Sequence, residues 1–114
     1  MPIAARWREL AALPAARGRD AMPGVYELAD AERRLLYIGQ SARDVPDRIR
    51  QHLVKSACIR ERARFWRYAP SRVPQAQEAA LLARHLEIHG ALPPCNRATP
   101  SERDAVRRYL ERSR

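Results

Sequence analysis

The sequence predicts an α+β fold in which a small three-stranded antiparallel sheet is flanked by helices, with extra helices near both ends of the chain. Three observations lead to this prediction. Two short segments with strand-like residues are joined by a charged turn, a third strand-like segment follows, and the intervening segments carry apolar residues at helical spacing between proline and glycine boundaries. The chain has 114 residues, so we expect residues 1–114 to form a single domain with a modest core.

The first element is expected to be a helix over residues 3–13. Its apolar residues, among them Trp7 and Leu10, fall on one helical stripe, and Pro14 would end it. Residues 14–23 are interpreted as a linker. The sequence therefore predicts a short helix that is separated from the sheet.

A β-hairpin is predicted next. Residues 24–29 (GVYELA) alternate as a strand does, and residues 34–40 (RLLYIGQ) have the aliphatic and aromatic content that strands favour. The charged residues 30–33 form the connection between them. A connection this short makes the two strands antiparallel neighbours.

A helix is expected to follow the hairpin. Pro46 suits its first turn and Asp44 can cap it, while Ile49 and Leu53 would form its buried stripe. Residues 63–69 (ARFWRYA) are the candidate third strand.

The clearest helix covers residues 74–89, where Pro74 opens it, leucines repeat at helical spacing and Gly90 closes it. A last helix over residues 100–112 is indicated by a capping box that begins at Thr99.

Composition and charge narrow the possible functions. The formal net charge is +9, from 22 Lys and Arg against 13 Asp and Glu, which favours a polyanionic partner because phosphate contacts release counterions. Lys55 is the single lysine, and an arginine- and alanine-rich composition can also come from GC-rich coding. No segment reaches the run of about 20 apolar residues of a membrane span. Cys58 and Cys95 do not make a disulfide framework, so we expect a reducing, cytoplasmic setting.

Two tyrosines and a pair of basic side chains are the first candidates for chemistry. Tyr26 and Tyr37 lie on the paired strands, where tyrosine is also an ordinary half-buried strand residue. Arg48 and His52 are four residues apart and share a helix face. Arginine binds phosphate in a bidentate manner and histidine can hold or pass a proton. In a chain this rich in arginine, the same pair also fits a solvated helix face.

A carboxylate and an amide complete the candidates. Glu78, in the first turns of the helix over 74–89, is either a favourable charge at a helix N-terminus or a ligand of Mg²⁺, which often takes only one or two protein carboxylates. Asn96 follows Pro93-Pro94-Cys95, where turn formation is its ordinary role. A zinc site would need Cys58, Cys95 and the two histidines of the longest helix. Their spacing disfavours it.

The order of these features is more specific than any one of them. It resembles the pattern of the GIY-YIG nuclease family over residues 23–97. The matching residues, in sequence order, are Gly24-Val25-Tyr26, Tyr37-Ile38-Gly39, Ser41, Arg48 with His52, Glu78 and Asn96.

The resemblance implies a three-stranded antiparallel sheet between helices and a divalent-metal-dependent nuclease that cuts DNA with one Mg²⁺ or Mn²⁺ ion. By the same resemblance, Glu78 is the metal ligand and Tyr26 the general base. Arg48 stabilises the charge on the phosphate, Tyr37 and His52 orient water and phosphate or relay protons, and Asn96 supports the site or the leaving side.

With no separate recognition domain expected, cleavage would be structure-selective or weakly sequence-specific on duplex, branched or single-stranded DNA, or a partner protein would direct it. The alternatives are a non-catalytic nucleic-acid-binding module on the same fold and a basic interaction domain of a larger complex. The candidate DNA-binding residues are Ser41, Arg50, Lys55, Arg64, Arg67, Arg107 and Arg108.

Overall fold

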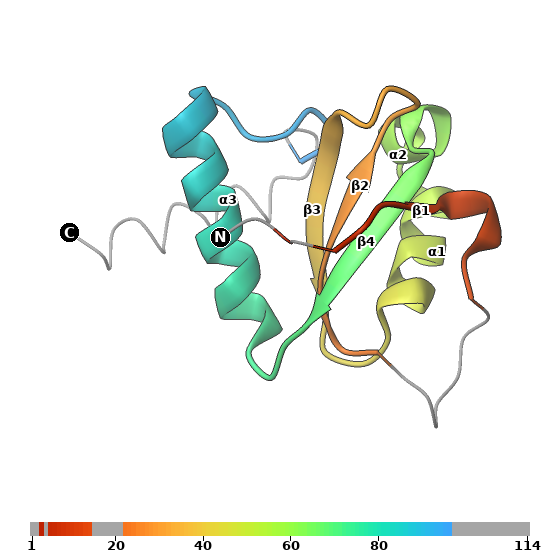
Figure 1. Cartoon of the computed structure of the whole chain (residues 1–114), viewed down its shortest axis with the longest axis horizontal. Helices are drawn as coiled ribbons and strands as arrows, with labels where there is room; N and C mark the ends of the chain where they lie inside the picture. The colour runs from red at the N-terminus through yellow and green to blue at the C-terminus, as the bar shows by residue number, and fades with distance from the viewer. Residues whose placement is uncertain (1–2, 4, 15–21, 97–114) are drawn as a thin grey trace.

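The protein is a four-stranded antiparallel sheet with helices on both faces, as the computed structural model shows for residues 3, 5–14 and 22–96 (Figure 1). The strand order is β1-β4-β2-β3. In chain order the elements are β1 (Arg8–Glu9), the 3-10 helix η1 (Leu10–Ala12), β2 (Gly24–Ala29), β3 (Leu35–Ser41), α1 (Val45–Lys55), α2 (Ala57–Arg62), β4 (Phe65–Pro70) and α3 (Pro74–His89).

The hairpin of β2 and β3 is confirmed as part of this sheet. The two strands pair antiparallel from Gly24 opposite Ser41 to Ala29 opposite Leu35. Asp30 shapes the turn, because one of its side-chain oxygens accepts the backbone N–H groups of Glu32 and Arg34. β2 also pairs with β4 along its whole length, so it is an interior strand and all its residues are buried.

The prediction for residues 3–13 is wrong. Instead of a helix, Arg8 and Glu9 pair with Trp66 and Phe65 of β4 as a fourth strand, and only one 3-10 turn follows. The apolar residues Ile3 and Leu10 do pack against the core, but they belong to its two separate layers. Of the predicted linker, residues 15–21 lie outside the described part of the chain, as does the predicted helix over 100–112.

Both long helices begin where the sequence predicts, and α3 also ends where it predicts. The Asp44 side chain accepts the N–H of Asp47 at 3.2 Å and caps α1. Gly90 ends α3 in the left-handed conformation with φ of 75°, which glycine adopts without strain. The short helix α2, capped by Ser56 through the N–H of Ile59, was not predicted.

The core is divided by the sheet into two layers. One contains Leu28, Ile49 and Trp66 between the sheet and the pair α1 and α2. The other contains Val25 and Leu82, between the sheet and α3. Figure 1 shows α3 on one side of the sheet and α1 with α2 on the other.

The two cysteines form a disulfide, which corrects the expectation that they stay reduced. Cys58 of α2 and Cys95 are bonded, with their Cα atoms 5.6 Å apart. The two cysteines are 37 residues apart in the sequence. They meet because α2 packs beside the segment that follows α3, and the sequence alone does not show this packing. Disulfides are rare in reducing compartments, so the two cysteines no longer support the expectation of a cytoplasmic setting. No helix among the described residues is long and apolar enough to cross a membrane.

Candidate active site

The tyrosines of the two paired strands project from the same face of the sheet, toward α1. Tyr26 lies opposite Gly39, and Leu28 lies opposite Tyr37. Since side chains alternate between faces along a strand, Tyr26, Tyr37 and Gly39 share one face. Both tyrosines are buried in the cluster that also contains Val45 and Ile49 of α1.

Gly39 provides the space that Tyr26 occupies. A Cβ atom at this position would lie 2.5 Å from both Cζ and Oη of Tyr26 and 2.7 Å from Cε2 of Tyr37. The Tyr26 ring therefore lies across the glycine, and the Tyr37 ring lies beside it with its centroid 6.0 Å from that of Tyr26. Any larger residue would force the two hydroxyl-bearing rings to move.

His52 of α1 completes a cluster of three rings. Its Nε2 lies 3.2 Å from the Tyr37 hydroxyl oxygen in a hydrogen bond, and its ring centroid lies 4.9 Å from that of Tyr37 and 6.4 Å from that of Tyr26. Burial, together with the positive charges of Arg48 and Lys55, lowers the pKa of His52 to about 4. The imidazole is therefore neutral near pH 7, and one of its ring nitrogens is available as a hydrogen-bond acceptor.

Arg48 lies one helical turn before His52 and is exposed to solvent. Its guanidinium donates to the side-chain oxygen of Gln51 at 3.0 Å. Arg48 and His52 thus form one face of α1, as the spacing predicted, with the imidazole against the tyrosines and the guanidinium within reach of a ligand in solvent. This arrangement suits an anionic group beside the ring cluster.

Ser41 has a local structural role. Its hydroxyl oxygen accepts the N–H groups of Arg43 and Asp44 at 3.2 and 3.0 Å, which forms the turn from β3 into α1. Asp44 then caps α1 and also accepts the N–H of Met22 at 3.1 Å. Ser41 therefore fixes the angle at which α1 brings Arg48 to the sheet, and its predicted contact with DNA stays a prediction.

Asn96 is fully buried and holds the outer edge of β3. Its side-chain oxygen accepts the N–H of Ile38 at 2.8 Å, and its side-chain nitrogen donates to the carbonyl of Ile38 at 3.0 Å. The N–H of Cys95 donates to the carbonyl of Leu36 at 2.8 Å. Because Ile38 lies between Tyr37 and Gly39, Asn96 positions the backbone that carries the ring cluster.

Glu78 is buried, with 8% of its surface exposed, in the helix α3 that packs against β3. A single carboxylate matches the donor set of Mg²⁺ or Mn²⁺, which complete their coordination with water and phosphate oxygens. No group of three or more His, Cys, Asp or Glu side chains that could hold a metal occurs among the described residues. The zinc alternative loses two of its four ligands, because Cys58 and Cys95 are bonded to each other.

Some of the cations predicted to bind DNA are exposed in the structure, whereas others have partners within the protein. Lys55 and Arg64 are exposed, at the C-terminus of α1 and before β4 respectively. The Arg50 guanidinium donates to the carbonyl of Pro14. Arg107 and Arg108 lie outside the described residues.

Arg67 has a structural role within the sheet, and its predicted contact with DNA stays a prediction. Its Nε lies 2.7 Å from a carboxylate oxygen of Glu27, its partner across the strands β2 and β4, and its guanidinium covers the Trp7 ring. Glu27 is buried, and burial raises its pKa even though Arg67 opposes that rise. The pair lies on the sheet face that packs against α3, so Arg67 balances a buried charge away from the tyrosine cluster.

Comparison with known proteins identifies the family of this site. The family model described as the GIY-YIG catalytic domain matches residues 22–80, which include β2, β3, α1 and the turn of α3 that carries Glu78. The chain belongs to the GIY-YIG family of catalytic domains. That family consists of nucleases, so the ring cluster lies in a nuclease domain. Searches among curated proteins and among solved structures found no match.

Besides α2 and the disulfide, the sequence did not reveal two further features of this GIY-YIG domain. The first is the fourth strand, β1, which extends the sheet beyond the three strands that were expected. The second is Tyr68, which lies opposite Tyr26 on β4. The signal for Tyr68 was the alternation of Trp66 and Tyr68, which places both aromatic rings on the face of the tyrosine cluster once β4 is paired with β2.

Proposed function

We propose that this GIY-YIG domain is a divalent-metal-dependent endonuclease that hydrolyses phosphodiester bonds in DNA, with selectivity for DNA structure more than for sequence. The observation that carries the proposal is a cluster of three rings beside the exposed Arg48. Tyr26 and Tyr37 lie over Gly39, and a neutral His52, one helical turn after Arg48, is hydrogen-bonded to Tyr37. Phosphodiester hydrolysis needs an oriented water, compensation of charge at the phosphate and stabilisation of the leaving oxygen. We assign one candidate residue of the domain to each requirement.

Tyr26 is the group we assign as general base toward the attacking water. An unperturbed tyrosine has a pKa of about 10, and positive charge nearby favours its ionised form. Tyr37 and His52 would orient that water. In the tautomer with Nε2 unprotonated, the neutral imidazole accepts the hydrogen bond that the Tyr37 hydroxyl donates, which leaves the Tyr37 oxygen able to receive a hydrogen bond from water.

Arg48 is assigned to the phosphate. A guanidinium makes two parallel hydrogen bonds to phosphate oxygens, and its charge persists throughout the reaction. Glu78 would hold one Mg²⁺ or Mn²⁺ ion, which supplies charge stabilisation at the leaving oxygen when bound. Asn96 acts through the backbone of β3 and is a positioning residue.

A non-catalytic binding module is the second candidate, since the basic charge alone would suit it. The carboxylate of Glu78 favours the enzyme, because a module that only binds phosphates has no need of a metal ligand. The exposed Lys55 and Arg64 would contribute phosphate contacts under either function. Delivery of the domain to its substrate by a partner protein is also part of the proposal.

The decisive experiment measures cleavage of labelled single-stranded, duplex, flap and junction DNA with Mg²⁺ or Mn²⁺. Glu78→Gln should abolish cleavage while DNA binding persists or tightens, because the variant removes both the metal ligand and a repulsive charge. Full cleavage by Glu78→Gln in Mg²⁺ would contradict the single-metal assignment. Binding of the wild-type protein without cleavage of any substrate would favour the binding module.

Arg48 is tested against a matched arginine. Arg48→Ala should raise the activation free energy by about 2–4 kcal/mol, as expected for a positioned donor to the transition state. Arg62, exposed at the end of α2, is the control that removes one charge elsewhere. Arg50 and Arg60 are unsuitable controls because they donate to the carbonyls of Pro14 and Val54. Equal losses for Arg48→Ala and Arg62→Ala would show that Arg48 is an ordinary surface cation.

A further inference from the structure

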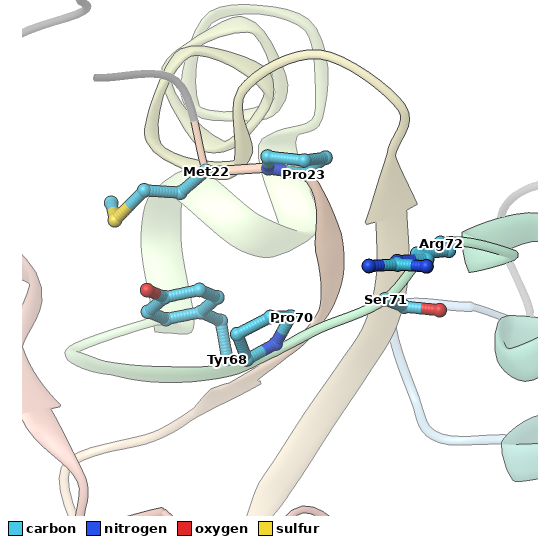
Figure 2. A pocket seen from close by; sticks show the side chains of 6 residues that line it. All are labelled: Met22, Pro23, Tyr68, Pro70, Ser71 and Arg72. Carbon is cyan, nitrogen blue, oxygen red and sulfur yellow. The ribbon is translucent and has the colours of Figure 1, made fainter.

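A hollow of about 450 Å³ opens beside the tyrosine cluster, at the end of the sheet where β2 begins and β4 ends. This volume lies within the range of about 300–1,000 Å³ typical of small-ligand sites. Figure 2 shows two apolar side chains on one side of the hollow, an aromatic ring and a proline on the facing side, and a serine and an arginine at one end. Its lining residues are Met22, Pro23, Tyr68, Pro70, Ser71 and Arg72.

The aromatic wall of the hollow is the open end of a stack. The rings of Trp66 and Tyr68 lie 5.9 Å apart, centroid to centroid, with 20° between their planes. Trp66 is buried in the core, whereas Tyr68 is half-buried and lines the hollow. A flat aromatic ligand that entered here would continue the stack on Tyr68. Met22 and Pro23 would contact its second face (Figure 2).

The hollow is one strand away from the proposed general base. Tyr68 lies directly opposite Tyr26 in the pairing of β4 with β2, and such partners have Cβ atoms only about 5 Å apart on the same face. Tyr26 leans over Gly39 toward β3. Tyr68, Tyr26 and Gly39 therefore lie side by side on β4, β2 and β3. The hollow lies at the Tyr68 end of this row, and His52 lies toward its Gly39 end.

The polar end of the hollow fits a nucleotide. Arg72 is exposed, and an arginine can bind a phosphate or stack on a base. Ser71 is held by the rest of the fold, because its N–H donates to the carbonyl of Pro23 and its hydroxyl oxygen accepts the N–H of Val73 at 3.1 Å. The chain charge of +9 also favours an anionic ligand over a neutral aromatic one.

We propose that this hollow binds an unpaired nucleobase, that of the nucleotide adjacent to the phosphodiester at Tyr26 and Arg48. The inference rests on the proposed function and narrows it. A base held within a duplex has both faces stacked on its neighbours, so only an unpaired or displaced base can stack on Tyr68. The preferred substrate class is therefore DNA with a single-stranded segment beside the cut, such as a flap or an open end.

The test measures binding and cleavage separately on the full chain. Binding is measured in EDTA at fixed salt with a flap DNA and a blunt duplex of the same sequence, because affinity depends on salt. The flap carries the fluorescent base 2-aminopurine at successive positions of its unpaired strand. Stacking on Tyr68 should quench the fluorescence at one position next to the cut and leave the others brighter.

Variants of the hollow should act on the unpaired strand alone. Tyr68→Ala should weaken flap binding roughly 5- to 100-fold, the range for loss of one base–aromatic stack, with duplex binding unchanged. Tyr68→Phe should retain flap binding, because it keeps the ring. Arg72→Ala should weaken flap binding more than Arg62→Ala does, although each removes one exposed arginine. Thermal unfolding of each variant identifies any loss that comes from the fold.

Each outcome decides the proposal. The hollow is overturned as a base site if folded Tyr68→Ala loses flap and duplex binding equally, or if its flap binding is unchanged. In either case, cleavage of duplex by the wild-type protein would still support the nuclease proposal. Position-specific quenching that disappears in Tyr68→Ala supports the hollow. If that quenching occurs without cleavage of any DNA, the base site stands and the nuclease proposal fails. Matching effects of Arg72→Ala and Arg62→Ala would also count against the hollow.

Discussion

Replacement of Gly39 by alanine tests whether the geometry of the ring cluster controls activity. The new Cβ atom would lie 2.5 Å from Cζ of Tyr26, whereas ordinary contact begins at 3.4 Å. The Tyr26 ring must therefore move by about 1 Å, a shift that a close-packed interior resists. The Tyr37 ring, with Cε2 at 2.7 Å from the new atom, blocks an escape in that direction.

Two magnitudes follow from this displacement. Overpacking of a buried site should lower the free energy of unfolding by about 1–3 kcal/mol. A displacement of about 1 Å in a catalytic group should lower turnover roughly 100-fold. The His52 hydrogen bond to Tyr37 should weaken as well, because the Tyr37 ring is also displaced.

Gly90→Ala provides the matched control. Gly90 has a φ of 75°, and no atom lies within 4 Å of the position that an added Cβ would take, so alanine there costs about 1–2 kcal/mol through backbone strain alone. Urea denaturation of both variants gives their stability, and cleavage of labelled DNA at a temperature where both are folded gives turnover. If Gly39→Ala cleaved as fast as Gly90→Ala at comparable stability, the position of Tyr26 would not matter to the chemistry.

Three further predictions concern stability. The Cys58–Cys95 disulfide joins residues that are 37 apart, so its reduction should lower the free energy of unfolding by about 4 kcal/mol through loop entropy. Urea denaturation with and without reductant measures this loss. A Cys58→Ser, Cys95→Ser variant is the control and should not respond to the reductant. The pKa of His52 is about 4 when folded against about 6.5 when unfolded. The unfolded chain therefore binds more protons, and stability should fall as pH drops from about 6.5 to about 4. Histidine NMR titration checks the pKa, and His52→Gln should remove that part of the loss. Arg67→Ala should cost about 3–5 kcal/mol, because it leaves buried Glu27 without its partner, whereas Arg67→Ala with Glu27→Leu should recover much of the loss in thermal unfolding.

Local signals predicted the elements that local interactions determine. Asp44 and Gly90 mark the ends of α1 and α3 through a side-chain cap and a left-handed residue, and both effects involve only neighbours in sequence. The hairpin connection is likewise fixed by Asp30 and its own backbone neighbours.

Long-range pairing explains what was missed. Residues 8 and 9 lie in a segment with helical apolar spacing but become β1 because β4, more than 50 residues later, offers an open edge. A register is also needed to see that Arg67 faces Glu27 and that Tyr68 faces Tyr26. The candidate residues Tyr26, Tyr37 and His52 were found through the order of motifs. The contact of the two tyrosines over Gly39 depends on the register of the strands, and the contact of His52 with Tyr37 depends on the angle of α1.

The amide of Asn96 has a consequence for solubility. An unpaired strand edge invites strands from other molecules, and proteins that leave such edges open tend to aggregate. By bonding both the N–H and the carbonyl of Ile38, the Asn96 side chain imitates the peptide group of a further strand without extending the sheet. The short β1, with two residues, limits the opposite edge. A sheet this small thus keeps its outer strand from becoming a template for fibrils without the addition of a further strand.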